Sequence, residues 1–432
     1  MKRLLAAVLL ACLLAGCTEQ SPYIPTGGGF QDEGNTPSSQ GQLQVQGDIR
    51  LSYNRDGSLH PYTATDLNNR SLLCLVYQGL FATNDAYEPT PILCRSYKIS
   101  ADMKEWTFYL ENATFSDGQA LTAQDVVASL RAADASGFYA GRFRHVKSIW
   151  AGNDGSVVIS LNTPMSNLPL LLNIPIIKAS QINAATPLGT GPYILEDTAD
   201  GKQLRRQPAW WCNAAAPVNA PIIPLDHGVS QNQLWDLYKF SGLSMLVTDT
   251  YVDFRGDYEL WESENGQFLY LSCNTKSPVF SNKAVRSALT HAIDREALVE
   301  KFYRGFAMAT TLPASPNFPY YSSKLAERYG YDSMKFVDAL SNSGQQGAEI
   351  TFVVNADDSL RVRVGRNIAK TLEDYGLKVT TLEMTSSKFT EHLRWGEYDL
   401  YLGQTKLSPN MDLTAFFMED GALSWGGMAN AT

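Results

Sequence analysis

The residue types that most often carry catalysis are scattered in this sequence. Its five histidines are His60, His145, His227, His291 and His392. They form no HExxH motif or paired spacing, and none stands beside a cysteine pattern suited to zinc. The chain also lacks a GxSxG nucleophile elbow and a GxxxxGK phosphate loop. We therefore predict a binding protein and not an enzyme, with no catalytic residues, no metal site and no cofactor.

Cys17 has the clearest chemical signal. A basic start at Lys2 and Arg3, an unbroken apolar run at 4–14 and two small residues precede it, which is the layout of a secretory signal. The run is too short to span a membrane, because a spanning helix needs roughly 20 apolar residues. The motif LAGC resembles the lipobox of bacterial lipoproteins, in which a lipid thioether forms on the cysteine. We expect a lipoprotein signal peptide at 1–16 and lipid attachment at Cys17; an ordinary signal peptide with an incidental cysteine is the alternative.

Residues 17–47 have the composition of a tether. They are rich in Gly, Ser, Pro and Gln, show no helical or strand periodicity, and cannot bury enough apolar surface to fold. Treated as a flexible coil, about 30 residues place the folded body roughly 30 Å from the bilayer.

Four further cysteines remain in the body of the chain: Cys74, Cys94, Cys212 and Cys273. Outside the cell, four cysteines can form disulfides in three ways, and the pair Cys74 and Cys94 is the first to test. Buried thiols that behave as small hydrophobes are the other interpretation. The sequence leaves both open.

Composition limits the kinds of partner. The formal net charge is −9 and no basic run follows the signal, so we expect no nucleic-acid partner, since phosphate binding needs clustered Lys and Arg. With 432 residues, 44% of them hydrophobic, the chain can bury a large core, and its length suggests about two or three domains. No later apolar stretch reaches spanning length, so we expect a soluble body.

The first half of the body mixes strands and helices. Residues 104–115 alternate apolar and polar side chains, as in a half-buried strand, and residues 155–161 do so again. Between them, Thr122 and Asp125 have the spacing of a capping box, which predicts a helix that begins near Ala123.

The second half has a βαβ pattern. We predict strands at 349–355, 377–382 and 398–402, with helices at 360–375 and 386–395 between them and two shorter helices within 281–305. Consecutive crossovers of this kind give a parallel sheet, whose ligands gather at the carboxyl ends of the strands. Those ends are the loops after Asn355, Leu382 and Gly403.

Five segments in order resemble the solute-binding proteins of dipeptide and oligopeptide ABC importers. They are LVYQGLF (75–81), FSDGQALTAQDVVASL (115–130), GTGPYIL (189–195), LYLSCNTKSPVFSNKAVRSALTHAIDREALV (269–299) and the pair YGLKV and GEYDLYLG (375–403). Each segment alone consists largely of turn and helix-cap residues that occur in many folds. Together they cover most of 48–420.

The resemblance implies an α/β fold of the two-lobed periplasmic-binding-protein type (type II), with an inserted α+β subdomain. It assigns 48–68 and 187–273 to the first lobe, 69–186 to the inserted subdomain, and 274–432 to the second lobe. Family chains continue well past the position of Thr432, so the second lobe is expected to be incomplete. Ligand binding closes the lobes, which requires a ligand that favours the closed state.

By the same resemblance, the ligand-binding residues are Asp56, Ser58, Leu59, Asn274, Thr405, Lys406 and Trp425. Family members that hold a peptide amine carry an aspartate shortly after the strand equivalent to 398–402. This chain has Lys406 near that place, with Asp412 several residues on. A lysine would repel an ammonium group and attract a carboxylate, which weakens the case for a peptide. A shifted alignment that brings Asp412 into the cleft is the competing explanation.

The function implied is that of a lipid-anchored substrate-binding component of an ABC importer, which delivers a peptide or similar small solute to permease subunits. We expect a monomer held to the cell membrane by its N-terminal lipid and facing the extracellular or periplasmic side. The alternatives are a surface receptor or sensor on the same scaffold, and a binder of metal complexes or other non-peptide solutes.

Overall fold

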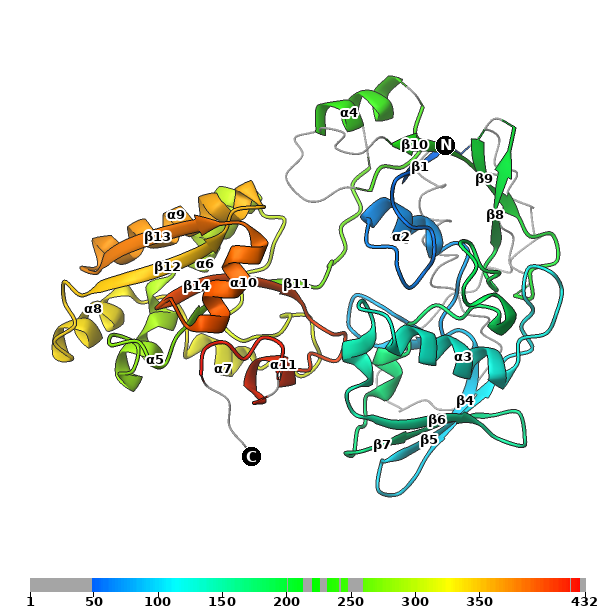
Figure 1. Cartoon of the computed structure of the whole chain (residues 1–432), viewed down its shortest axis with the longest axis horizontal. Coiled ribbons are helices and arrows are strands. Elements are labelled where there is room, and N and C mark those ends of the chain that lie inside the picture. Colours follow the sequence, from blue (N-terminus) through cyan, green and yellow to red (C-terminus); the bar gives the residue numbers. More distant parts are fainter. Residues whose placement is uncertain are drawn as a thin grey trace, which may run out of the picture. The chain divides into compact units, whose positions relative to one another are not determined.

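The computed structural model describes residues 49–199, 201–212, 220–225, 231–240, 242–247, 259–419 and 421–427. The predicted signal peptide, Cys17 and nearly all of the tether therefore lie outside the described residues. Two compact units are present: Asp85–Tyr87 group with the chain from Trp261 onward as unit 2, and the rest up to Leu260 forms unit 1. Figure 1 shows the elements of each unit.

Unit 1 contains two four-stranded sheets. The first has the order β1 (Leu51–Asn54), β10 (Ala220–Leu225), β9 (Gly201–Arg206) and β8 (Tyr193–Thr198), in which only β1 and β10 are parallel. The second is antiparallel, with the order β4 (Cys94–Ile99), β5 (Glu105–Leu110), β7 (Val157–Leu161) and β6 (Val146–Ala151). A hairpin pairs β2 (Phe81–Thr83) with β3 (Pro89–Pro91).

The helix predicted near Ala123 is confirmed. It is α3 (Ala123–Asp134), and its capping box has Thr122 and Asp125 each accepting from the other's backbone N–H. Val126 and Leu130 of α3 are fully buried in the same core as β5 and β7. This core also contains Leu51 of β1, so the segment expected to be an inserted subdomain shares one hydrophobic core with the first sheet.

Two of the motifs that suggested the family touch each other in unit 1. Gly191 of GTGPYIL donates its N–H to the Val76 carbonyl of LVYQGLF at 2.9 Å. A Cβ at Gly191 would lie 2.6 Å from the Leu75 carbonyl oxygen, and a Cβ at Gly189 would overlap the Val76 carbonyl oxygen. Glycine is needed at both positions because the two backbones approach so closely.

Unit 2 is built on one sheet. Its order is β11 (Gln267–Cys273), β14 (Leu400–Lys406), β12 (Glu349–Asn355) and β13 (Lys378–Met384), with β12, β13 and β14 parallel, as the βαβ pattern predicted. β11 pairs antiparallel with β14 over its whole length. The expected lobe boundary after Cys273 is therefore displaced, because this pairing places β11 in the sheet of unit 2.

Helices cover both faces of this sheet. Phe352 and Val354 of β12 share a core with α5 (Lys283–Ala292), α8 (Ser333–Asn342) and α9 (Ser359–Asp374). Val353 lies on the opposite face, where it packs with Leu393 of α10 (Ser386–Trp395). Side chains alternate along a strand, so neighbouring residues of β12 belong to different cores. Figure 1 shows α9 and α10 beside these strands.

The remaining short elements connect these parts. The predicted caps Asn282 and Asp294 begin α5 and α6, and Gly376 ends α9 with a φ of +99°. The other helices are α2 (Leu67–Leu73), α4 (Gln231–Phe240), α6 (Arg295–Leu298), α7 (Ser323–Glu327) and α11 (Thr414–Phe417), with a π-helix at Val299–Tyr303 and 3₁₀ turns at Ala140–Phe143, Leu168–Leu171 and Ala179–Gln181. Among the described residues, no helix has the length and apolar character to cross a membrane.

The structure decides between the two interpretations of the cysteines. Cys74, Cys94, Cys212 and Cys273 all remain thiols. Cys94 is only 2% exposed in the core of unit 1, whereas Cys74 is exposed at the end of α2. The Cys74–Cys94 disulfide is therefore absent, and the small-hydrophobe interpretation fits Cys94.

Candidate functional site

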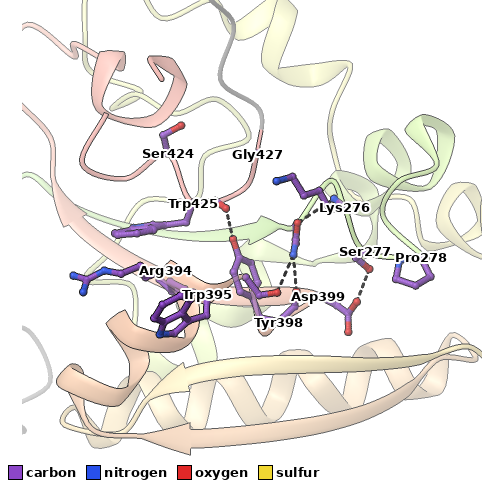
Figure 2. Close-up of a pocket in the computed structure, with 13 residues that line it drawn as sticks. Lys276, Ser277, Pro278, Arg394, Trp395, Tyr398, Asp399, Ser424, Trp425 and Gly427 are labelled. Carbon is purple, nitrogen blue, oxygen red and sulfur yellow. Dashed lines mark hydrogen bonds between the residues drawn. The ribbon is translucent and has the colours of Figure 1, made fainter. Parts of the chain in front are cut away.

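A pocket of about 490 Å³ lies in unit 2, where β11 ends and β14 begins. Its lining comes from residues 274–278 after β11, residues 393–396 at the end of α10, residues 398–399 before β14 and residues 424–427 after α11. Figure 2 shows these side chains around the pocket. This volume is in the range of sites for small-molecule ligands.

Asn274, one of the predicted ligand-binding residues, lines this pocket and is 8% exposed. Its Nδ2 donates to the carbonyl oxygens of Gly396 at 3.3 Å and Tyr398 at 3.0 Å, and its Oδ1 accepts from the Lys276 N–H at 3.0 Å. Both amide hydrogens are therefore used within the protein. Asn274 holds the loop after β11 against the segment that enters β14.

Asp399 is the only carboxylate in the lining, and it too is occupied. One of its oxygens accepts from the Ser277 hydroxyl and the other from the Thr351 N–H at 2.7 Å. Its own N–H donates to the Thr351 carbonyl at 2.9 Å. These bonds fix the start of β14 beside β12 and leave Asp399 with a structural role.

Trp425, also predicted from the sequence, forms one wall of the pocket. The Tyr398 hydroxyl donates to its carbonyl oxygen at 2.5 Å, as Figure 2 shows. Burial, with a smaller effect from nearby Tyr401, raises the pKa of Tyr398, so this phenol stays protonated and remains a donor. The Thr275 hydroxyl donates to the Gly426 carbonyl at 3.0 Å and holds the same loop from its other side.

The sequence analysis missed Lys276, Arg394, Trp395 and Ser424, all of which line the pocket. Leu393 is 5% exposed, whereas the next two residues are exposed in the last turn before Gly396. A Trp beside an Arg on an exposed helix end was an available signal for two of the four. Nothing in the local pattern distinguishes Lys276 or Ser424.

Three predicted residues belong to unit 1. Ser58 and Leu59 line a second pocket, of about 570 Å³, together with Thr63 and residues 182–186. Asp56 is exposed, lies next to that pocket's loop and does not line it. The predicted loop is therefore pocket-forming, although only two of its three chosen residues face the pocket.

His60 orders this loop. Its Nδ1 accepts from the Tyr62 N–H at 3.2 Å, so its Nε2 carries the proton and donates to the Ile182 carbonyl at 2.9 Å. The Ser58 hydroxyl is 2.6 Å from that of Thr63 and accepts from the His60 N–H at 3.1 Å. His60 is thus a structural residue of the second pocket.

Thr405 and Lys406 lie away from the pocket that contains Asn274 and Trp425. The register pairs Cys273 with Leu400 at one end of the β11–β14 ladder and Gln267 with Lys406 at the other. Six residue steps of about 3.3 Å put these ends roughly 20 Å apart. The structure therefore does not bring the predicted residues of unit 2 into one site.

The two residues also lie on different faces of β14. Leu402 packs in the core of α9, and Gln404, two residues on, accepts from the Arg361 guanidinium of α9 at 2.8 Å. By strand alternation Lys406 belongs to this same face, whereas Thr405 shares the face of α10. The loops after Asn355, Leu382 and Gly403, at the carboxyl ends of the parallel strands, were the expected place for a ligand. The unit 2 pocket lies instead at the opposite ends of these strands.

No metal site is evident where the structure describes the chain: no three His, Cys, Asp or Glu side chains are grouped to hold an ion.

The fold is that of a two-lobed type II binding protein, and comparison with known proteins names its family. The model of the family "Bacterial extracellular solute-binding proteins, family 5 Middle" matches residues 88–421, so the chain belongs to this family. The glutathione-binding protein GsiB of Escherichia coli K12 is 25% identical over 390 residues, which cover 85% of this chain and 74% of GsiB.

Solved structures show the same fold at lower sequence identity. NikA from Brucella suis, in complex with Fe(III)-EDTA, superposes with a TM-score of 0.71 at 20% identity and covers 89% of this chain and 85% of NikA. The oligopeptide-binding protein AppA from Bacillus subtilis, in complex with a nonapeptide, gives a TM-score of 0.58 at 20% identity and the same coverage of both chains. At this identity the likeness establishes the fold alone.

Proposed function

We propose that this protein is the lipid-anchored substrate-binding component of an ABC importer and that it captures a peptide or similar small solute. The observation that carries the proposal is the family match over residues 88–421, which includes most of the unit 2 pocket but not Ser424, Trp425 and Gly427. Buried Asn274 and half-buried Asp399 hold that pocket's loops by hydrogen bonds, so its shape is largely set before a ligand arrives.

The proposed ligand class is broad because the related proteins differ in the ligands that they bind. The names of the relatives include a glutathione-binding protein, and the related structures hold an iron chelate and a nonapeptide. One scaffold thus serves chemically different ligands, and the side chains of the pocket decide between them. Within our proposal, Asn274 and Trp425 are site residues of the unit 2 pocket, which Asn274 shapes, and Ser58 and Leu59 are site residues of the separate unit 1 pocket.

Native mass spectrometry of the full chain, purified without added ligand, tests this function. A ladder of peptide masses or one small-solute mass, lost on partial unfolding, is the expected result. Uptake of the identified solute should fall in cells that lack the gene and return when the gene is restored. A chain that carries and binds no solute would overturn the proposal. Unchanged uptake with a lost transcriptional response to the solute would assign a sensor role instead.

A further inference from the structure

Two cations at the rim of the unit 2 pocket have no partner for their charged groups among the residues that the structure describes. Lys276 follows β11, and Arg394 lies in the last turn of α10. Both side chains are exposed, and the charged group of neither makes an ion pair or hydrogen bond with any residue that the structure describes. In Figure 2 they project from different sides of the pocket, Arg394 on the side of the two indoles.

The pocket offers no comparable partner for a positively charged group of a ligand. Its one carboxylate, Asp399, already accepts from Ser277 and Thr351. Glu397 is adjacent in sequence but does not line the pocket, and its carboxylate lies 3.5 Å from the His392 ring. A ligand ammonium group would therefore meet two positive charges and one carboxylate that already accepts two hydrogen bonds, whereas a ligand carboxylate would meet two cations whose charged groups no described residue pairs.

The rest of the lining suits a flat apolar group. Trp425 and Trp395 both line the pocket, and Trp395 is 69% exposed, an unusual position for so large an apolar side chain. An indole that a ligand can cover gains contact area at little cost in conformational entropy. Ser424 also lines the pocket, and its buried hydroxyl oxygen has no hydrogen-bond partner among the described residues.

We propose that the unit 2 pocket selects an organic anion, a solute with a carboxylate and a flat apolar portion, and that Lys276 and Arg394 are its specificity-determining residues. This inference rests on the proposed function and specifies the ligand class of the same site. It differs from recognition through a free amine, which would need an unoccupied carboxylate in the pocket.

Isothermal titration with three probes of one shape tests the charge preference. N-acetyl-phenylalanine is an anion. N-acetyl-phenylalanine amide is neutral, and phenylalanine amide, which has a free amine, is a cation. We expect the full chain to bind the anion at least about tenfold more tightly than the neutral probe, since two charge-assisted contacts are lost together. The dipeptide Asp-Phe, run beside them, distinguishes an acidic peptide from a non-peptide carboxylate as the preferred source of the anion.

Two variants assign the preference to the rim. Lys276→Gln and Arg394→Gln should each weaken binding of the anion by about threefold to tenfold and leave the neutral probe unchanged. Because both side chains are exposed and unpartnered, the variants should unfold at the wild-type temperature. Lys283→Gln removes the same charge from an exposed position outside the pocket and should bind all probes as the wild type does.

The outcomes separate this inference from the proposed function. Equal affinity for the three probes, a preference for the cation, or binding of none of them would overturn the anion inference. So would a loss of affinity as large in Lys283→Gln as in the rim variants. The importer function is tested separately, because the mass spectrum and the uptake measurement report on it independently of these probes.

Discussion

At the scale of the residue, the unit 2 pocket separates side chains that shape it from side chains that remain available. Asn274 bonds three neighbouring backbone groups and Asp399 accepts from the Ser277 hydroxyl and the Thr351 N–H, whereas the polar side-chain atoms of Lys276, Arg394 and Ser424 have no partner among the described residues. A buried amide that bonds three backbone groups stabilises the loop and contributes little directly to a ligand.

Asn274→Ala should therefore reduce stability. The change leaves the Gly396 and Tyr398 carbonyls and the Lys276 N–H without their partner, and we expect a loss of about 2 kcal/mol in the free energy of unfolding. Urea unfolding followed by tryptophan fluorescence measures it. Asn342→Ala, at the exposed end of α8, should change stability by less than about 0.5 kcal/mol. Equal stability of the two variants would contradict the structural role of Asn274.

The thiols of Cys94 and Cys74 should react at very different rates. Burial raises the pKa of the Cys94 thiol to about 12. Only about one Cys94 thiol in ten thousand is then ionised at pH 8, and the thiolate is the reactive form. Cys74 is exposed. We expect iodoacetamide at pH 8 to label Cys74 in the native protein and Cys94 only after denaturation, as peptide mass spectrometry reports. Recovery of a Cys74–Cys94 linked peptide would show that the disulfide forms.

At the scale of the element, the contact between α9 and β12 depends on the presence of glycine, which has no side chain, at position 365. A Cβ on Gly365 of α9 would lie 2.8 Å from a methyl group of Val354, which is completely buried. Real Cβ contacts are longer than this, so the helix lies as close to the strand as it does because position 365 is glycine.

Gly365→Ala should destabilise unit 2 although alanine is the better helix former. Overpacking costs about 1 to 3 kcal/mol, against a gain of about 1 kcal/mol in helix propensity. We expect a lower melting temperature in differential scanning calorimetry. Gly141→Ala, where an added Cβ meets no atom within 4 Å, is the matched control and should melt close to the wild type. A rise in stability for Gly365→Ala would contradict the close approach.

At the scale of the whole molecule, the chain combines a proposed membrane anchor with two α/β units that each carry a pocket. An importer component must stay near its permease, and a lipid on Cys17 followed by a tether would provide that. A single acyl chain binds membranes only weakly, whereas two or more acyl chains give stable attachment.

Cys17→Ala should abolish attachment. We expect the wild-type chain to partition into the detergent phase in Triton X-114 extraction, and the variant to appear in the aqueous phase or as an uncleaved precursor. Cys12→Ala, within the apolar run of the signal, should partition as the wild type does. A Cys17→Ala chain that still carried lipid would rule out this residue as the attachment point.

Local patterns in the sequence predicted the βαβ elements of unit 2 and several helix caps in both units, although the strand predicted at 398–402 runs over Leu400–Lys406. Strand β12 has the predicted bounds, and the boundaries of α9, β13 and α10 fall within two residues of prediction, because apolar periodicity and caps such as Asp358 and Gly376 act over a few residues. The motifs also led to the correct family and fold.

Only the tertiary structure decided which residues meet. The pairing of β11 with β14 moved β11 into unit 2, and the register of that pair separated Lys406 from Asn274 by the length of a strand. It also placed Arg394 and Trp395 beside Trp425, from segments about 30 residues apart in the chain. The sequence could not supply this because strand pairing and loop contacts depend on residues far apart in the chain, and a shift of one position in a strand reverses the face of every side chain.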